Sequence, residues 1–305
     1  MIESSARPTG SHLEIVRARW IRKTTCTNQP GAVPSPIGGA RMTRPVRIGI
    51  QIQPQHAPEY GLIRDAVLRA EDAGVDIVFT WDHFYPLFGD PDGAHFECWT
   101  MLAAFAEQTE RVEIGALVSS AGYRNPDLLA DMARTVDHIS GGRLILGLGA
   151  GWFERDYDEY GYEFGTAGSR LRLLAEYLPR VTARLGKLVP PPTRHIPVLI
   201  GGGGEKKTLP LVAQHADIWH SFGDLKTYSR KVGILSERCA DHGRSPDSIT
   251  HSTKWPGIED AKKHVDAGVT LFTVHAEGPK FDFTELKRAI AWRDENTPPP
   301  LSGLA

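Results

Sequence analysis

The stretch NPDLLADMARTVDHISGGRLILGLG, residues 125–149, contains the unit whose repetition decides the fold. Asn125 can cap a helix, and Pro126 then takes the first helical position, where no backbone N–H is needed. A Gly-Gly pair at 141–142 allows the left-handed turn that ends a helix, and a strand is predicted directly afterwards at 143–148. Apolar residues at spacings of three and four predict one buried helix face: Leu128, Leu129, Met132, Val136 and Ile139.

The same alternation of a short apolar run and a helical stretch recurs along most of the chain. Strands are predicted at residues 46–52, 75–80, 112–118, 143–148, 197–200, 217–220, 249–254 and 270–274. Helices are predicted at residues 59–73, 96–108, 126–139, 169–186, 205–215, 227–242, 257–267 and 283–295. Apolar strands that alternate with helices indicate a parallel sheet covered by helices. Eight such units in about 250 residues predict an α/β fold, the closed (β/α)8 TIM barrel.

The barrel is predicted to occupy residues 45–297. Residues 1–44 are rich in Arg, Ser, Thr, Gly and Pro and contain no long apolar stretch, so we expect a disordered extension. Met42 lies directly before the first predicted strand and is a candidate for the natural start. A loose tail is expected over residues 298–305, because three prolines close the last helix.

Two prolines disturb the predicted helices. Pro179 lies inside the stretch 169–186, where we expect a kink or two shorter helices. In a helix beginning at Glu205, Pro210 would lie beyond the first turn and would cost about 3 kcal/mol. A helix capped by Thr208 would instead place Pro210 in its first turn, where proline is tolerated.

The composition argues against several classes of protein. Lys and Arg total 35 and Asp and Glu total 37, a formal net charge of −2, so no nucleic-acid or membrane partner is expected. No apolar run approaches the roughly 20 residues of a membrane helix. The cysteines Cys26, Cys98 and Cys239 are far apart, which argues against a disulfide framework and a cysteine-based metal site. We expect a reduced, cytoplasmic protein.

In such a barrel the functional residues lie at the carboxyl ends of the strands. The second predicted strand leads into Asp82 and His83, an acid beside an imidazole that could orient and protonate a ligand. The fourth leads into Gly149-Ala150-Gly151, whose glycines allow a ligand to approach the backbone. The candidate acids Glu154 and Asp156 follow, although both could simply serve the first turn of the next segment.

A run of four glycines at residues 201–204 follows the fifth predicted strand. Backbone N–H groups and the positive end of a helix suit a phosphate, and Lys206 and Lys207 add charge. The Lys-Ser/Thr ending of a Walker loop is absent, and so is the usual context of a GxGxxG fingerprint. Metalloprotease and serine-hydrolase motifs are also absent. The sequence therefore predicts a phosphate-bearing ligand and no metal.

Several ordered segments together resemble the luciferase-like monooxygenase family, specifically its branch that uses the deazaflavin coenzyme F420. The resemblance covers residues 45 to about 296. The segments that carry it are RIGI at 47–50, WDHF at 81–84, YRNP at 123–126, DHISGGRL at 137–144, GLGAGW at 147–152, IGGGGEKKTL at 200–209 and AWRDE at 291–295.

The resemblance implies a role for each matching position. Asp82 and His83 match a pair that lies over the reacting ring, with His83 as the proton donor or acceptor. Leu117 and Val118 match a bulged, non-proline cis peptide that supports the face of the ring. The glycine run matches the phosphate loop. The implied cofactor-binding residues are Leu117, Val118, Gly151, Trp152, Gly201, Gly202, Gly203, Gly204, Glu205, Trp219 and Ser221.

The chain departs from the family pattern at three places. Some deazaflavin enzymes carry an acid where this chain has Trp152, so Glu154 is the remaining candidate for a second proton-transfer group. Most relatives have a long excursion before the fifth strand, whereas here about 45 residues separate Trp152 from Pro197, so a more open site is expected. Relatives usually have another residue where Pro210 stands.

The resemblance predicts an oxidoreductase that transfers hydride between coenzyme F420 and a small organic substrate. One alternative is an FMN-dependent monooxygenase that uses O2 and a separate reductase. A second alternative is a barrel that binds the cofactor without catalysis. Dimerisation is common among similar proteins, so a homodimer is also an expectation.

Overall fold

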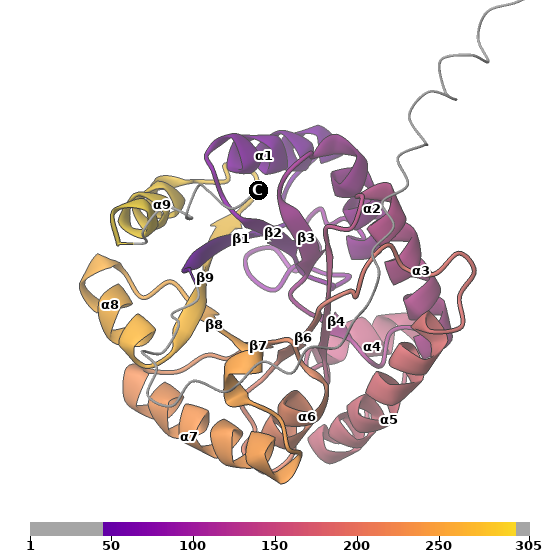
Figure 1. Ribbon diagram of the computed structural model, residues 1–305. Coiled ribbons are helices and arrows are strands. Elements are labelled where there is room, and N and C mark those ends of the chain that lie inside the picture. The colour runs from indigo at the N-terminus through magenta and orange to yellow at the C-terminus, as the bar shows by residue number, and fades with distance from the viewer. Residues whose placement is uncertain (1–44, 297–305) are drawn as a thin grey trace, which may run out of the picture. The chain divides into compact units, whose positions relative to one another are not determined.

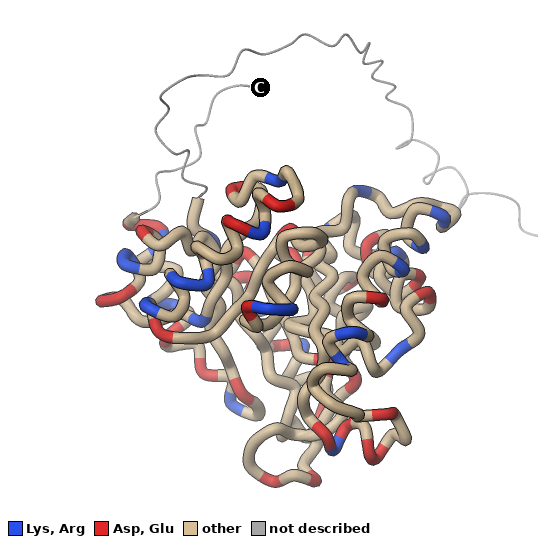
Figure 2. The backbone as a smooth tube through the Cα atoms, turned by 90° about the horizontal axis from the view of Figure 1, so that it is seen from below, with Lys and Arg blue, Asp and Glu red and all other residues tan. Residues whose placement is uncertain are grey.

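The computed structural model describes residues 45–296, and these form a closed parallel barrel surrounded by helices (Figure 1). The extension expected at residues 1–44 and the tail expected at 298–305 lie outside the described residues. No helix of residues 45–296 is both long enough and apolar enough to cross a membrane. Basic and acidic residues are interspersed over the outer helices and loops (Figure 2).

Every strand pair in the barrel is parallel, and β3 pairs with β5 to close the ring. The short strand β4 follows β3 at the same position in the barrel and also pairs with β5. The nine strands therefore occupy eight positions around the barrel. The predicted (β/α)8 barrel is therefore confirmed. The strands are β1 Arg47–Gln53, β2 Ile77–Thr80, β3 Glu113–Ala116, β4 Ser119–Ser120, β5 Leu144–Gly149, β6 Val198–Gly201, β7 Ile218–His220, β8 Thr250–Lys254 and β9 Val269–Glu277.

The helices form a ring outside the strands (Figure 1). They are α1 Tyr60–Asp72, α2 Cys98–Gln108, α3 Pro126–Ile139, α4 Glu154–Tyr160, α5 Ala167–Leu185, α6 Thr208–His215, α7 Leu225–Asp241, α8 Ile258–Asp266 and α9 Thr284–Asn296, with a 3-10 turn at Pro246–Ser248. The short helix α4 was not predicted, because its sequence ERDYDEY has no apolar periodicity. It lies in the segment between β5 and β6 and carries residues that contact the site.

Helix α3 begins as its sequence predicts, but it buries a different face. The Asn125 side chain accepts hydrogen bonds from the first-turn backbone, and Pro126 takes the first helical position. Leu129 and Val136 are buried as expected, whereas Leu128 is 54% exposed and Ile139 is 40% exposed. The remaining buried positions are Ala130, Ala133 and Asp137. Small side chains here allow α3 to pack closely against its neighbours, which hydrophobic spacing alone does not reveal.

The alternative of two shorter helices at Pro179 is wrong, because α5 is one helix that runs through the proline. Buried side chains before and after it, Leu174 and Val181 among them, hold both halves against the barrel. The helix after the glycine run begins at Thr208 with Lys207 as its cap. Pro210 therefore lies in the first turn, although the cap is Lys207 and not Thr208, which is the first helical residue.

Two apolar cores hold the barrel together. The larger one lies between the strands and the helices, and the smaller one fills the barrel interior with Ile77, Phe79, Leu117, Ile145, Leu199, Ile218 and Leu271. Glycines allow the backbones of neighbouring strands to approach each other where the barrel closes. A Cβ atom at Gly147 would lie 1.8 Å from the carbonyl oxygen of Ala116, far inside van der Waals contact.

We expect Gly147→Ala to lower the free energy of unfolding by more than about 2 kcal/mol, because the Ala116 backbone must move to admit the methyl group. Gly233→Ala is the matched control, since an added Cβ in helix α7 meets nothing within 4 Å. The control should raise stability by about 0.5–1 kcal/mol. Urea unfolding followed by circular dichroism measures both, and equal stabilities of the two variants would contradict the close approach.

Candidate active site

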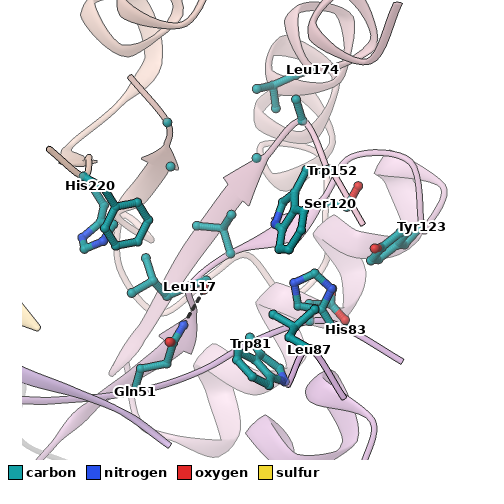
Figure 3. A pocket seen from close by; sticks show the side chains of 18 of the residues that line it. Gln51, Trp81, His83, Leu87, Leu117, Ser120, Tyr123, Trp152, Leu174 and His220 are labelled. Carbon is teal, nitrogen blue, oxygen red and sulfur yellow. Dashed lines mark hydrogen bonds between the residues drawn. The ribbon is translucent and has the colours of Figure 1, made fainter. Parts of the chain in front are cut away.

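A cavity of about 510 Å³ opens at the carboxyl ends of the strands, where the barrel fold places functional residues. Its wall combines an apolar rim with polar groups near the strand ends (Figure 3). The apolar and aromatic members are Trp81, Leu87, Phe88, Leu117, Val118, Tyr123, Ala150, Trp152, Leu171, Leu174 and Phe222. The other members are Gln51, Gln53, Asp82, His83, Ser120, Gly149, Gly151, Gly201, Gly202, Thr208, His220 and His275.

His83 lies in the cavity wall and is held by the carboxylate of Asp156. Its Nδ1 is 2.7 Å from Asp156 Oδ2. Because a carboxylate only accepts hydrogen bonds, Nδ1 carries the proton and donates it. This contact orients the imidazole and leaves Nε2 for a ligand, which is the arrangement that a proton donor or acceptor needs.

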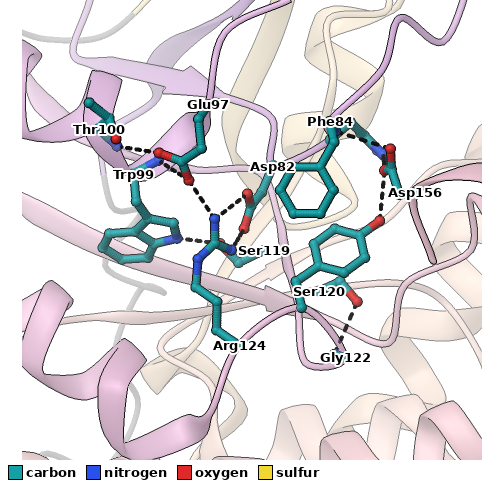
Figure 4. Close-up of polar contacts among 12 residues, drawn as sticks. Asp82, Phe84, Glu97, Trp99, Thr100, Ser119, Ser120, Gly122, Arg124 and Asp156 are labelled. Carbon is teal, nitrogen blue, oxygen red and sulfur yellow. Dashed lines mark hydrogen bonds and ion pairs between the residues drawn. The ribbon is translucent and has the colours of Figure 1, made fainter. Parts of the chain in front are cut away.

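Asp156 is fully buried and accepts hydrogen bonds from three donors. Besides His83, the Tyr123 hydroxyl donates to Oδ2 at 2.7 Å and the Phe84 backbone N–H donates to Oδ1 at 3.0 Å (Figure 4). Burial and the adjacent carboxylate raise the pKa of Tyr123 well above its usual value, so its hydroxyl keeps its proton. Three donors offset much of the cost of burying a charged group, and they tie α4 to the ends of β2 and β4.

Asp82, predicted to act with His83, instead forms a buried ion pair with Arg124. The Arg124 guanidinium donates to both carboxylate oxygens, at 2.5 and 3.0 Å, and also to Glu97 at 2.5 Å (Figure 4). Burial alone would lower the pKa of Arg124, but Asp82 reverses the effect and raises it. Asp82 therefore balances a buried cation beside the site, and this contact anchors the loop that follows β4.

Aromatic rings surround His83 on several sides. Trp81 meets it edge to face at 5.7 Å, Trp152 at 5.8 Å and Phe153 at 5.6 Å between ring centroids. Trp152 is 63% exposed at the mouth of the cavity. Trp81 donates through Nε1 to His95 at 2.9 Å, and burial lowers the pKa of His95 to about 4. An uncharged His95 can accept this bond, which orients the Trp81 ring.

The peptide between Leu117 and Val118 is cis, as the resemblance implies. Both side chains lie in the cavity wall, between the short strands β3 and β4. The Gln51 side chain reaches from β1 and donates to the Leu117 carbonyl at 2.7 Å (Figure 3). The prediction of one continuous strand over 112–118 is therefore wrong at its end, where the chain leaves the β3–β5 ladder and exposes two side chains to the cavity.

The glycine run brings backbone close to the cavity over only part of its length. Gly201 and Gly202 belong to the wall, whereas Gly203 and Gly204 lie beyond it. A Cβ at Gly203 would collide with Lys231 Nζ at 2.3 Å and Ser221 Oγ at 2.6 Å. A cationic nitrogen and a hydroxyl thus adjoin bare backbone, which is a suitable setting for an anion.

The remaining residues of the predicted phosphate region lie behind or outside the wall. Glu205 pairs with Arg230. Trp219 is fully buried and donates to the Gly202 carbonyl at 2.8 Å, so it supports the glycine backbone from behind. Glu154 is exposed at the start of α4 and does not reach the cavity, because the helix turns Asp156 inward instead.

Two histidines, at the end of β7 and near the end of β9, also belong to the wall: His220, within the segment 219–221 that the resemblance implies for the cofactor, and His275, which was not predicted. His220 is 2% exposed, and its Nδ1 lies 2.9 Å from Ser252 Oγ. Burial lowers the pKa of His220 to about 3, with His275 as a further cause. Burial and then Lys254 lower the pKa of His275 to about 4. Both imidazoles are therefore neutral near pH 7, and His220 lies across the cavity from His83 (Figure 3).

The structure thus brings together His83, Asp82, Leu117, Val118, Gly151, Trp152, Gly201 and Gly202 around one cavity. Sequence reasoning missed Tyr123, Arg124 and His275 and preferred Glu154 to Asp156 as the acid. The available signal was positional, since Tyr123 and Arg124 follow shortly after β4 and His275 lies near the carboxyl end of β9. No group of His, Cys, Asp and Glu in the described range has the geometry to hold a metal ion.

A barrel with a histidine, aromatic rings and a glycine-lined strand end around one cavity is suited to a large heterocyclic cofactor. The family model for luciferase-like monooxygenases matches residues 44–258. The chain belongs to the luciferase-like monooxygenase family.

Individual relatives differ in the cofactor that their names give. An F420-dependent glucose-6-phosphate dehydrogenase of Amycolatopsis mediterranei is 30% identical over 193 residues, which are 56% of this chain and 54% of that relative. An F420-dependent secondary alcohol dehydrogenase, solved with an F420-acetone adduct, superposes with a TM-score of 0.70 at 16% identity, over 79% of this chain and 96% of that one.

A second similar structure is of a protein in complex with FMN. The oxygenating constituent of a Pseudomonas putida 3,6-diketocamphane monooxygenase, in complex with FMN, superposes with a TM-score of 0.57 at 17% identity, over 73% of this chain and 71% of that one. At this identity the likeness of both structures concerns the fold alone.

We expect Asp156→Asn to lower the free energy of unfolding by about 2 kcal/mol or more, because the amide cannot accept all three hydrogen bonds of the carboxylate. Glu154→Gln, two residues away and exposed, should change stability by less than about 0.5 kcal/mol. Urea unfolding at pH 7 compares them. A loss in Glu154→Gln as large as in Asp156→Asn would contradict the assignment of Asp156 as the buried anchor.

Proposed function

We propose that the protein is a coenzyme F420-dependent oxidoreductase that transfers hydride between the deazaflavin ring and a small organic substrate. The observation that carries this proposal is His83, fixed by Asp156 at 2.7 Å in the wall of an otherwise largely apolar cavity. A single oriented imidazole can move a proton to or from a substrate oxygen. Redox chemistry itself requires a cofactor, because protein side chains alone do not supply hydride at a carbonyl.

The residues present fit such a cofactor at the glycine-lined end of the cavity. A Cβ at Gly201 would lie 3.0 Å from Val118, and one at Gly149 would lie 2.6 Å from the same side chain. Bare backbone is therefore required where β5 and β6 face Val118. Beyond it, Lys231 and Ser221 adjoin Gly203 and would hold an anionic tail.

When bound, the deazaflavin ring supplies or accepts the hydride. The protein's own contribution is orientation, exclusion of water and proton transfer. Leu117 and Val118 would support the ring face, while Trp81 and Trp152 narrow the space around His83. The Nε2 atom of His83 would exchange a proton with the substrate oxygen, and Asp156 would hold the imidazole in position through Nδ1.

The names of relatives support F420 over FMN for this chain. The Amycolatopsis relative, at 30% identity, and the alcohol dehydrogenase structure are both F420-dependent by name. FMN remains the second candidate, because the diketocamphane monooxygenase shares the fold and contains FMN. The bound cofactor decides between reversible hydride transfer and monooxygenation with O2.

We expect the 305-residue chain to bind oxidised coenzyme F420 with micromolar or tighter affinity and at least about tenfold more tightly than FMN. Tryptophan fluorescence reports binding, because Trp81 and Trp152 lie in the cavity wall. Tighter binding of FMN would overturn the choice of cofactor and favour the monooxygenase. Tight binding of F420 with no hydride transfer to any carbonyl, enone or quinone would favour a carrier protein.

We expect His83→Ala to reduce turnover by about 10²- to 10⁴-fold while the affinity for F420 changes little, because His83 moves a proton and does not contact the anionic tail. His242→Ala is the matched control, since that side chain is exposed at the end of α7. Single-turnover hydride transfer and a fluorescence titration separate the two quantities. Lost affinity with unchanged turnover of the bound fraction would remove His83 from the catalytic role.

A further inference from the structure

The wall of the cavity contains no lysine or arginine within the described part of the chain. Asp82, a carboxylate of the same wall, already pairs with Arg124, which also donates to Glu97 (Figure 4). Proteins hold phosphates and carboxylates mainly through Arg and Lys side chains, because these carry the opposite charge. A charged substrate would have to leave water for a wall that offers it no compensating charge, which is costly. An uncharged substrate avoids this cost.

Other cations around the cavity are held by protein groups or lie outside the wall. Arg155 donates to Asp92 at 2.5 Å, and Arg170 donates from Nε to the Gly151 carbonyl at 3.0 Å. Neither arginine side chain belongs to the wall. Two lysines of the segment from α7 to the end of β8 also lie outside it, namely Lys231 and Lys254. In the proposed complex Lys231 would meet the anionic tail of the cofactor, so it is not available to a substrate.

Apolar side chains enclose the space around His83. Figure 3 shows Trp81, Leu87 and Trp152 around the imidazole, and all three belong to the cavity wall. Trp152 is 63% exposed and Phe88, another member of the wall, is 59% exposed. Large apolar groups that are exposed in a cavity gain free energy when an apolar ligand covers them. This part of the wall is therefore complementary to an apolar molecule with one polar atom at His83.

Phe88 is held in place despite its exposure, because residues that follow β1 fix its backbone. The Gln55 side chain accepts from the backbone N–H of Leu87 at 2.9 Å and of Phe88 at 3.4 Å. His56 Nε2 donates to the Phe88 carbonyl at 2.7 Å, since a carbonyl oxygen only accepts. Gln55 is fully buried and donates to Glu277 at 2.5 Å. Phe88 thus has a fixed position from which it can define the shape of the substrate space.

We propose that the substrate is an uncharged, largely apolar secondary alcohol or the corresponding ketone, selected by Phe88 and Trp152 at the mouth of the cavity. The inference rests on the proposed function for the cofactor and the type of reaction. It adds that the substrate carries neither phosphate nor carboxylate. His83 can exchange one proton with one substrate oxygen, which is what an alcohol–ketone pair requires.

The reaction needs no further reactant. Because Nδ1 of His83 donates to Asp156, Nε2 carries the lone pair and accepts the proton of the substrate hydroxyl. The C–H bond at the alcohol carbon breaks, and its hydrogen leaves with both electrons to the oxidised deazaflavin. A C=O bond forms, so one alcohol becomes one ketone, the cofactor gains one hydride and His83 gains one proton. The reverse sequence reduces the ketone.

The test compares two substrates that differ in one methyl group and one negative charge. The full chain, loaded with oxidised coenzyme F420, receives methyl 4-hydroxycyclohexanecarboxylate or the free acid, which is ionised at pH 7. Reduction of F420 gives kcat/KM for each alcohol. We expect the ester to exceed the acid by at least about 100-fold, because the wall does not compensate the carboxylate. Quenching of tryptophan fluorescence by the two matching ketones gives their relative affinities without any hydride transfer.

A cation introduced at the mouth should weaken this selection. Phe88→Arg and Trp152→Arg should each reduce the ratio of ester to acid to less than about tenfold, because a guanidinium then pairs with the substrate carboxylate. Ile258→Arg is the matched control and should leave the ratio unchanged, since Ile258 is 54% exposed on α8 and lies outside the wall. Circular dichroism verifies that each variant folds. If one of the two mouth variants does not fold, the other variant and the unaltered chain decide.

Equal kcat/KM for the ester and the acid in the unaltered chain would overturn the inference and leave the proposed function standing, because F420 would still be reduced. Binding of neither ketone would overturn the inference as well. An unchanged ratio in the folded arginine variants would overturn the selection by Phe88 and Trp152. Preferential binding of the ester-bearing ketone without reduction of F420 by either alcohol would remove the proposed hydride transfer, while the selectivity of the cavity for uncharged molecules would stand.

Discussion

The closure of the barrel between β3 and β5 is the constraint on which the rest of the molecule depends. The contact between the two strands is short: Ile114 and Gly115 of β3 pair with Leu144 and Ile145 of β5, and the pairing of β3 with β5 ends there. Closure brings the carboxyl ends of the strands around one cavity, so residues far apart in the sequence become neighbours. The glycine at position 147 makes the approach possible, because any side chain there would strike the Ala116 carbonyl.

Two buried carboxylates near the carboxyl ends of the strands, Asp82 and Asp156, have different roles at the site. Asp82 is balanced by a full positive charge on Arg124, and this ion pair joins the ends of β2 and β4. Asp156 accepts hydrogen bonds from an imidazole, a hydroxyl and a backbone amide, of which only the imidazole readily gains a charge. Asp156 therefore fixes the imidazole of His83 through Nδ1, whereas both oxygens of Asp82 accept hydrogen bonds from the guanidinium of Arg124.

The cavity also has two chemically distinct sides. Around His83 the rings of Trp81, Trp152 and Phe153 create an apolar enclosure that strengthens the contact with Asp156 by keeping water away. On the opposite side, the wall includes His220 and His275, whose rings are neutral near pH 7 because burial lowers the pKa of both.

The amino-acid sequence by itself determined the number and order of the eight β/α units, because apolar runs and helical spacing are local properties of the chain. It also placed His83 and the glycines at strand ends, since that position follows from strand order alone. The extra helix α4, the exposed Leu128 and the continuity of α5 at Pro179 depended on packing against neighbours. Only the tertiary structure paired His83 with Asp156 and Asp82 with Arg124, because those partners are separated by 73 and 42 positions and meet only when the barrel closes.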